Sequence, residues 1–191
     1  MRSISSNTLG IIAEDDSDVD SIVLLCTRII NKKISSKKFV GNGGGKILQK
    51  CSQWADLLKQ RGCNRLLIIH DSDKNVPAEV YSNIKKSLGF SPIRKNLICI
   101  PVQELEAWLL SDPAAIKKGM NLKKEPKIKN MPESINDPKE YLGEIIRKLD
   151  RTKIYLNTIH NTKIMEHVSL EKLTTRCPSF IPFLEFVKNN I

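Results

Sequence analysis

The sequence predicts an α/β fold in which a mainly parallel sheet is flanked by helices and followed by a helical C-terminal extension. Short apolar runs alternate with longer stretches whose apolar residues recur at helical spacing, a pattern typical of parallel strands joined by crossover helices. Residues 65–70 (RLLIIH) contain a continuous apolar run, as expected for a strand covered on both faces. The chain has 191 residues, 40% of them hydrophobic, which is enough to bury a core.

The first half of the chain is expected to alternate strands and helices. The expected strands are residues 8–13, 34–40, 65–70 and 96–102, and the helices between them are residues 19–30, 46–60 and 78–88. Ser17 or Asp18 stands where a side chain would cap the first helix. The turn GNGGGK at residues 41–46 leads into the second helix. A flexible connection is the favoured interpretation of this turn over a phosphate cradle, because the full phosphate-loop spacing is missing.

The pattern changes after the fourth strand, which divides the chain into an α/β core, residues 1–112, and a basic insertion with a helical extension, residues 113–191, packed on that core. The segment QELEAWLLSD predicts a short helix, on which Trp108 is expected to lie in the core rather than to stack on a ligand. Residues 113–138 are rich in Lys, Asn and Pro and predict a flexible insertion. Further helices are expected at residues 138–149 and at residues 170–175 extended by 180–189.

The charge of the chain is strongly positive but unevenly distributed. Lys and Arg number 31 against 21 Asp and Glu, which gives a formal net charge of +10. Five acids fall within residues 14–20, whereas residues 31–50 hold six lysines and no acid. A basic track that neutralises nucleic-acid phosphates is one interpretation, and simple solubility is the other. The candidate phosphate contacts are Lys37, Lys38, Lys46, Lys123, Lys124 and Lys127.

Other features of the sequence exclude several classes of protein. No apolar run approaches the roughly 20 residues of a membrane helix, and the first residues lack the features of a secretory signal, so we expect a cytoplasmic protein without membrane contact. The five cysteines are an odd number with no CxxC pair, which predicts reduced thiols and no zinc site.

Acidic side chains follow three of the expected strands. Glu14 comes after the first strand, Asp71 and Asp73 after the third, and Glu104 with Glu106 just past the fourth. Because the carboxyl ends of parallel strands meet at one edge of a sheet, these acids are expected to lie together, and carboxylates are the ligands that Mg²⁺ or Mn²⁺ prefers. In an extended segment Asp71 and Asp73 would share a face and His70 would point away. The alternative is a set of helix caps and turn residues.

The order of these acids resembles a known family. A strand ending in Glu14, a second acid at Asp18 and a later strand ending in Asp71-Ser72-Asp73 are similar to the Toprim domain of topoisomerases, primases and the overcoming-lysogenization-defect nucleases. One branch of small bacterial Toprim-like proteins, some encoded beside ATPases of defence systems, also resembles this chain at four further places. These are VQELEAWLLSD (residues 102–112), NDPKEYL (residues 136–142), Tyr155 and CPSF (residues 177–180).

The resemblance implies a Toprim-type nuclease that hydrolyses nucleic-acid phosphodiesters with Mg²⁺ or Mn²⁺, in a phage-defence setting. Glu14, Asp18, Asp71 and Asp73 would hold the metal, with Glu104 or Glu106 completing the ligand set. Glu14, Asp71 and Asp73 would serve catalysis, and Lys163, in the basic segment that also holds His160, would stabilise charge on the phosphate. The implied partners are DNA or RNA and an ATPase, and a homodimer is compatible with the sequence.

Two other functions stay open. Toprim proteins usually have glycine after the first Glu, where this chain has Asp15, so a non-catalytic subunit that binds nucleic acid or an ATPase is the main alternative. The start IIAEDDSD also resembles a two-component receiver domain. Receivers need a lone acceptor Asp after the third strand, and here that strand ends in DSD.

Overall fold

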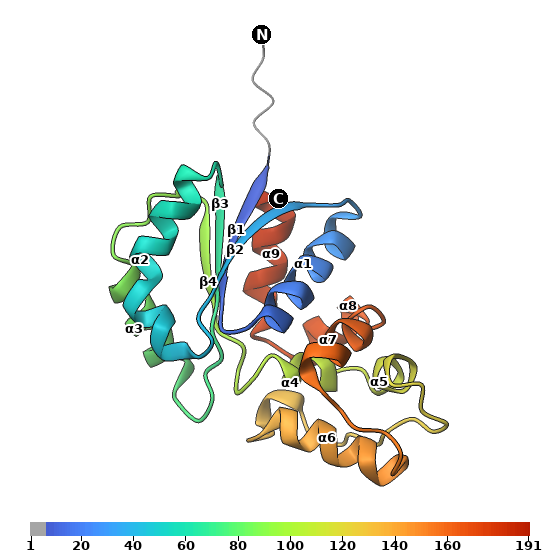
Figure 1. Cartoon of the computed structure of the whole chain (residues 1–191). Coiled ribbons are helices and arrows are strands. Elements are labelled where there is room, and N and C mark those ends of the chain that lie inside the picture. Colours follow the sequence, from blue (N-terminus) through green and yellow to red (C-terminus); the bar gives the residue numbers. More distant parts are fainter. Residues whose placement is uncertain (1–6) are drawn as a thin grey trace.

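A computed structural model describes residues 7–191 and contains a four-stranded, all-parallel sheet with strand order β2-β1-β3-β4 (Figure 1). The strands are β1 (Thr8–Ala13), β2 (Ser35–Val40), β3 (Arg65–Ile69) and β4 (Asn96–Cys99). Every residue of β1 is buried, as befits a central strand. The predicted α/β fold with a parallel sheet, flanking helices and C-terminal helices is therefore confirmed.

The crossover helices cover both faces of the sheet. Helices α2 (Gly44–Gln60) and α3 (Pro77–Leu88) lie on one face, while α1 (Asp16–Ile30) and the C-terminal α9 (Phe180–Asn190) lie on the other (Figure 1). The face under α2 and α3 has its own apolar cluster, which includes Ile12, Ile68 and Ile84. A larger cluster joins the other face to the C-terminal helices, so residues of β1 and α9 share one core.

Helix α1 begins earlier than the sequence indicated. Asp15 is its N-cap, and a capping box forms because the Asp15 side chain accepts from the Asp18 amide while the Asp18 side chain accepts from the Asp15 amide. The prediction that Ser17 or Asp18 caps the helix is therefore wrong, although Asp18 is the second member of the box. Acidic side chains here also favour the positive end of the helix dipole.

The C-terminal half is more ordered than its composition indicated. It contains α4 (Glu106–Leu110), α5 (Pro113–Gly119), a 3-10 turn η1 (Pro132–Ser134), α6 (Pro138–Leu149), α7 (Asn157–Met165) and α8 (Leu170–Arg176), followed by α9. The prediction of a flexible insertion at residues 113–138 is wrong, because Ile116, Leu122 and Ile135 of this segment are buried in the larger core. Helix α7, which the sequence did not indicate, is tied to α1 because the Arg28 guanidinium donates to the carbonyls of Met165 and Val168 at 2.6 and 2.7 Å.

Strand β4 ends at Cys99, three residues before the predicted boundary. Pro101 has no amide to donate, and Gln103 has a φ of 63°, so the chain leaves the extended conformation there.

Three further expectations concern single side chains and the membrane. Trp108 is fully buried, as expected, and all five cysteines are buried free thiols. Within residues 7–191, no helix has both the length and the apolar character needed to span a membrane.

Candidate metal centre

The carboxyl edge of the sheet brings together acids from β1 and β3. Glu14 directly follows β1, and its Oε1 accepts a hydrogen bond from the Asp71 amide, just past β3, at 3.1 Å. Burial raises the pKa of Glu14, although nearby His70 lowers it in part. The Glu14 carboxylate is thus held against the end of the neighbouring strand, as the sequence predicted for parallel strands.

Asp71 is the carboxylate on which the other acids converge. Its Oδ1 accepts from the Leu105 amide at 3.0 Å, which ties the end of β3 to the segment between β4 and α4. Burial raises the pKa of Asp71 well above its usual range, and four neighbouring carboxylates raise it further: Asp18, Glu106, Glu14 and Glu104. Four of the other five predicted ligand residues therefore lie close enough to Asp71 for their charges to repel its carboxylate.

Asp18 contributes a second desolvated carboxyl from the first turn of α1. It is buried, and burial, with the charges of Asp15 and Glu106, raises its pKa to about 8. Ion pairs to lysine or arginine would lower such a pKa. Within the described residues, no Lys or Arg forms an ion pair with Asp18, Asp71, Glu104 or Glu106.

Glu104 and Glu106 are oriented by the C-terminal helices. Glu104 Oε2 accepts from the Lys139 amide at 2.8 Å, in the first turn of α6. Buried Glu106 accepts from the Tyr155 hydroxyl at 3.1 Å and from Asn161 Nδ2 at 3.2 Å. The Tyr155 hydroxyl also donates to Asn161 Oδ1. Tyr155 and Asn161 thus fix a carboxylate of the site.

Asn161 and Asn157 are site residues that sequence reasoning missed. Asn161 is fully buried, and Asn157 Nδ2 contacts Asp15 Oδ2 at 3.3 Å and Ser17 Oγ at 3.4 Å. Both lie on α7, in a segment where the sequence pattern indicated only His160 and Lys163. The family resemblance alone indicated Tyr155.

Asp73 departs from its predicted arrangement. Its φ of 47° lies in the left-handed region, and its amide donates to the Gln103 carbonyl at 2.7 Å. Alternation of side chains holds only in an extended segment, so the argument that Asp71 and Asp73 share a face fails here. Asp73 is exposed, although its charge still raises the pKa values of Glu14 and Glu104 after the effect of burial.

His70 lies nearer the acids than the sequence indicated. Its Nδ1 is 3.1 Å from Glu14 Oε1 and 2.7 Å from the Asp71 carbonyl oxygen. On the other side of the ring, Gly44 at the start of α2 approaches so closely that a Cβ there would lie 2.6 Å from His70 Nε2. The glycine-rich turn therefore packs against the acidic edge. The glycine at position 44, which has no side chain, is the feature of the sequence that indicates this close approach.

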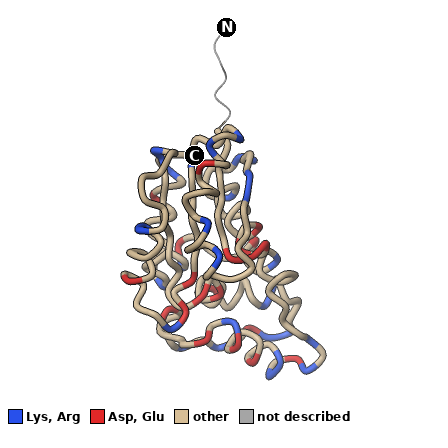
Figure 2. The backbone as a smooth tube through the Cα atoms, turned by 60° about the vertical axis from the view of Figure 1, so that its left-hand side comes forward, with Lys and Arg blue, Asp and Glu red and all other residues tan. Residues whose placement is uncertain are grey.

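The predicted cationic residues are dispersed. Lys38 pairs with Asp16 at 2.6 Å, Lys37 donates to the Arg61 carbonyl, and Lys46 lies exposed in the first turn of α2. Lys and Arg positions are spread over both ends of the molecule, whereas acidic segments gather where the strands end (Figure 2). Lys163 is exposed on α7 beside His160, and the predicted contacts Lys123, Lys124 and Lys127 are exposed in the segment between α5 and η1.

A groove of about 380 Å³ adjoins the acids between α6 and the segment before α7. Tyr155, Asn157 and Lys139 line it. The Tyr155 hydroxyl and the Lys139 amide bond to Glu106 and Glu104, whereas Asn157 bonds to Asp15, the N-cap of α1. Its charged residues are of both signs, because Glu140 and Glu144 line it together with Lys139 and Arg147. The groove is thus an opening beside the residues that orient the carboxylates.

The donor set of this edge suits a hard divalent cation, because it consists of carboxylates, most of them buried or half-buried, and burial with neighbouring charges raises the pKa values of Glu14, Asp18 and Asp71. The coordination sphere is not assembled in this conformation. Within residues 7–191, no three Asp, Glu, His or Cys side chains are grouped as metal ligands. The residues thus fit an ion in chemistry and location, and binding would require their side chains to turn toward one another.

Comparisons with known proteins give one match. A family model described as a domain of unknown function (DUF4276) matches residues 14–188. The match begins at the first acid of the site and runs almost to the end of α9. No curated protein and no solved structure matches the chain.

Proposed function

This chain belongs to the DUF4276 family, and we propose that it is a divalent-metal-dependent nuclease that hydrolyses phosphodiester bonds of DNA or RNA at the carboxyl edge of its sheet. The observation that carries the proposal is the group of desolvated carboxylates around Asp71, in which no lysine or arginine among the described residues forms an ion pair with Asp18, Asp71, Glu104 or Glu106. Such a group is unfavourable in the ligand-free protein and is favoured by a divalent cation. The sequence resemblance to Toprim domains also supports a metal-dependent nuclease.

Asp71, Asp18 and Glu14 would hold Mg²⁺ or Mn²⁺, with Glu104 or Glu106 completing the ligand set. When bound, such an ion acts as a Lewis acid on the phosphate and increases the acidity of water. The hydrogen bonds from the Asp71 amide, the Leu105 amide and Asn161 orient three of these carboxylates before any ligand arrives. These bonds hold the three carboxylates at the edge of the sheet, from which their side chains would turn toward a bound ion.

The groove beside the acids would receive the substrate. Lys139 and Arg147 line it together with Glu140 and Glu144, and the two cations would bind the phosphates on either side of the cleaved bond. Tyr155 and Asn157 would limit access of water from the α7 side, since both lie between the groove and the acids. Lys163 stays the proposed cation for charge developing on the phosphate, from its exposed position on α7.

A second candidate function is a non-catalytic subunit that binds nucleic acid or an ATPase through the same surface. The ungrouped ligand side chains within residues 7–191 favour it, as does Asp15, whose side chain is committed to capping α1. Both candidates place the protein in a defence system of the cytoplasm, as the family resemblance implies.

The two candidates are separated by incubating the full chain with plasmid DNA and with tRNA in MnCl₂, MgCl₂ or EDTA. We expect metal-dependent cutting that falls to the EDTA level in Asp71→Asn, a variant that keeps the shape of the side chain. The matched control is Asp20→Asn, an exposed carboxylate of α1, which should cut as the parent chain does. Unchanged cutting in EDTA or in Asp71→Asn overturns the nuclease, and binding without cutting in either metal establishes the second candidate.

A further inference from the structure

Strand β4 is the end strand of the sheet, and its outer side offers unpaired main-chain groups. The Leu66 amide donates to the Lys95 carbonyl and the His70 amide to the Cys99 carbonyl. Bonds to β3 therefore use the odd-numbered residues of β4, and the peptide groups of Asn96 and Ile98 point outward. Within the described part of the chain no strand lies beyond β4.

The two edges of the sheet differ in how they are protected. At the opposite edge, β2 carries exposed Lys37 and Lys38, and lysines on an edge strand discourage pairing with another chain. The sequence of β4 is NLIC, which holds no charge. No charged residue in β4 therefore discourages pairing of this edge with a further strand.

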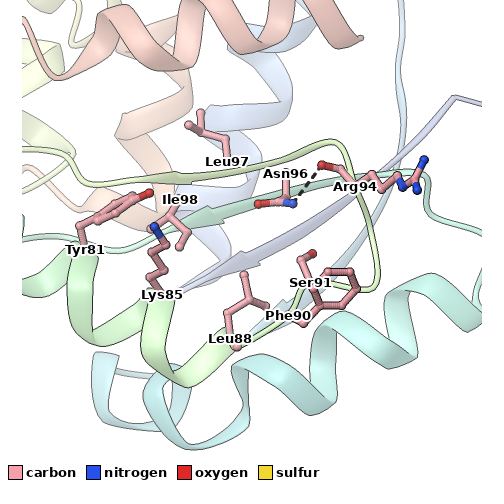
Figure 3. A pocket seen from close by; sticks show the side chains of 10 residues that line it. Tyr81, Lys85, Leu88, Phe90, Ser91, Arg94, Asn96, Leu97 and Ile98 are labelled. Carbon is pink, nitrogen blue, oxygen red and sulfur yellow. Dashed lines mark hydrogen bonds between the residues drawn. The ribbon is translucent and has the colours of Figure 1, made fainter.

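Two shallow grooves continue along this edge. The groove in Figure 3, of about 510 Å³, lies at the start of β4 and holds Lys85, Arg94 and Phe90 but no acid. The other, of about 430 Å³, lies toward the end of β4, where Pro178 and Pro182 line it and Glu133 is its one charged residue. The grooves share Tyr81, Leu97 and Ile98, so they form one surface with a basic end and an acidic end.

Phe90 stands out on this surface, since 94% of the residue is exposed. An aromatic side chain left in water beside an apolar groove is a marker of a contact surface. It follows Gly89 in the turn after α3 and lies at the basic end (Figure 3). The groove at the acidic end is the less polar of the two and has the apolar walls that such a ring requires.

We propose that this edge pairs with the same edge of a second copy of the chain, with the two β4 strands antiparallel and related by a two-fold axis at Ile98. Two Ile98 residues would then exchange main-chain hydrogen bonds, and Asn96 would do so with Ile100 of the other copy. The arrangement makes one eight-stranded sheet from two four-stranded sheets.

Antiparallel pairing brings the basic end of each copy to the acidic end of the other. Because the two-fold axis keeps the α3 faces of both copies on one side of the sheet, Phe90 then meets the Pro77 and Tyr81 wall of the groove at the acidic end, and Arg94 approaches Glu133, twice over. A two-fold interface requires such a self-complementary surface, in which a patch and its counterpart lie on the same molecule. This complementarity is the reason for choosing a second copy over an unrelated acidic strand, which would match the basic end alone.

Sedimentation velocity of the full chain over a concentration series tests the proposal. We expect a dimer whose dissociation constant rises at least about tenfold in Phe90→Ser and in Arg94→Glu, which corresponds to about 1.4 kcal/mol. Ile154→Ser is the matched control, because Ile154 is also an exposed apolar residue, at 64%, but lies outside both grooves. A monomer at every concentration overturns the proposal, as does a dimer that both substitutions leave unchanged.

The register is tested separately by a disulfide. In the proposed pairing Asn96, which is exposed, lies opposite half-buried Ile100 of the second copy at a Cα separation of roughly 5.5 Å, which a disulfide spans. The double variant Asn96→Cys with Ile100→Cys should therefore form a covalent dimer on mild oxidation, and neither single variant should. Covalent dimers that form equally with a single variant contradict the antiparallel register.

Discussion

Glu14 and Asp71 lie 57 residues apart in the chain and are joined by a hydrogen bond of 3.1 Å from the Asp71 amide to Glu14 Oε1. The same oxygen is 3.1 Å from His70 Nδ1. A single carboxylate oxygen thus links the ends of β1 and β3 and orients the group that the proposed cation would use. Substitutions can separate the two roles of Glu14, which are the hydrogen bond to the Asp71 amide and the proposed binding of a cation.

Glu14→Gln and Glu14→Ala are expected to differ in stability but not in activity. Glutamine keeps an oxygen that accepts from Asp71, whereas alanine leaves that amide unpaired, a loss of about 1–3 kcal/mol. Both remove the negative charge and should abolish metal-dependent cutting. Urea denaturation measures the first effect and the plasmid assay the second. Equal stability of the two variants would show that the hydrogen bond is unimportant.

Asp18 predicts a specific dependence of stability on pH. Its pKa in the folded protein is about 8, above its value of about 3.9 in an unfolded chain, so the folded state binds the extra proton between these values. The free energy of unfolding should therefore fall as the pH rises through this range. Asp18→Asn should stabilise the metal-free protein by at least about 1 kcal/mol above pH 8, with little effect near pH 4.

The control for this pH profile is Asp20→Asn, since Asp20 is an exposed acid on the same helix. Chemical denaturation in EDTA across the range gives the profiles. If the parent chain and Asp18→Asn show parallel profiles, the desolvated state assigned to Asp18 is contradicted.

Divalent ions should stabilise the folded chain if the carboxylates hold them. Binding to the folded state alone raises stability with ion concentration, and the effect should be largest above pH 8, where Asp18 is ionised. We expect MnCl₂ to raise the melting temperature of the parent chain, and Asp71→Asn to remove that rise. NaCl at equal ionic strength separates a specific site from general screening of charge.

The sequence predicted the fold and the proximity of two acids for the same physical reason. Parallel strands end at one edge, so an acid following Ala13 and one following His70 had to lie together, and Glu14 and Asp71 do. Helix α7 escaped prediction because it buries Asn161 among its core positions and exposes Ile159, which obscures the apolar period. A buried polar side chain becomes recognisable only when its partners, here Glu106 and Tyr155, are in place.

Local backbone conformation also limited how much of the site could be predicted from the sequence. Alternation of side chains placed Asp71 and Asp73 on one face, but the positive φ of Asp73 breaks the extended geometry that this argument needs. His70 was set aside by the same argument, which considered β3 alone, whereas Glu14 reaches it from β1. Contacts between neighbouring strands decide which side chains lie near the acids, and the pattern of residues along one strand does not reveal these contacts.

Gly44 is expected to tolerate no side chain. A Cβ at this position would lie 2.6 Å from His70 Nε2 and 3.5 Å from Glu14 Oε2, so Gly44→Ala should displace the ring or the first turn of α2 at a cost of about 1–3 kcal/mol. At the next position nothing lies within 4 Å of such a Cβ, so Gly45→Ala should be neutral or stabilise the helix. Thermal denaturation of the pair measures the difference, and equal losses would contradict the close approach of Gly44.

Asp112 predicts a pH dependence opposite in sign to that of Asp18. Burial alone would raise the pKa of its carboxyl, but hydrogen bonds from Lys172 Nζ at 2.7 Å and the Ser169 amide at 3.0 Å lower it overall. The folded state therefore releases this proton more readily than the unfolded chain, and the stability that Asp112 contributes above about pH 4 should be lost as the pH falls through its folded pKa.

Asp112→Asn should accordingly destabilise the protein near neutral pH, by about 1–3 kcal/mol, and lose most of that effect in acid. Lys172→Met tests the partner: it removes the cation from an exposed position while leaving the Ser169 and Ala114 amides bonded to Asp112, so its loss should be smaller. Urea denaturation at neutral pH and near pH 3 resolves the two variants. Because Asp112 joins the start of α5 to the start of α8, a loss that stays constant with pH would mean that shape, rather than charge, holds these helices together.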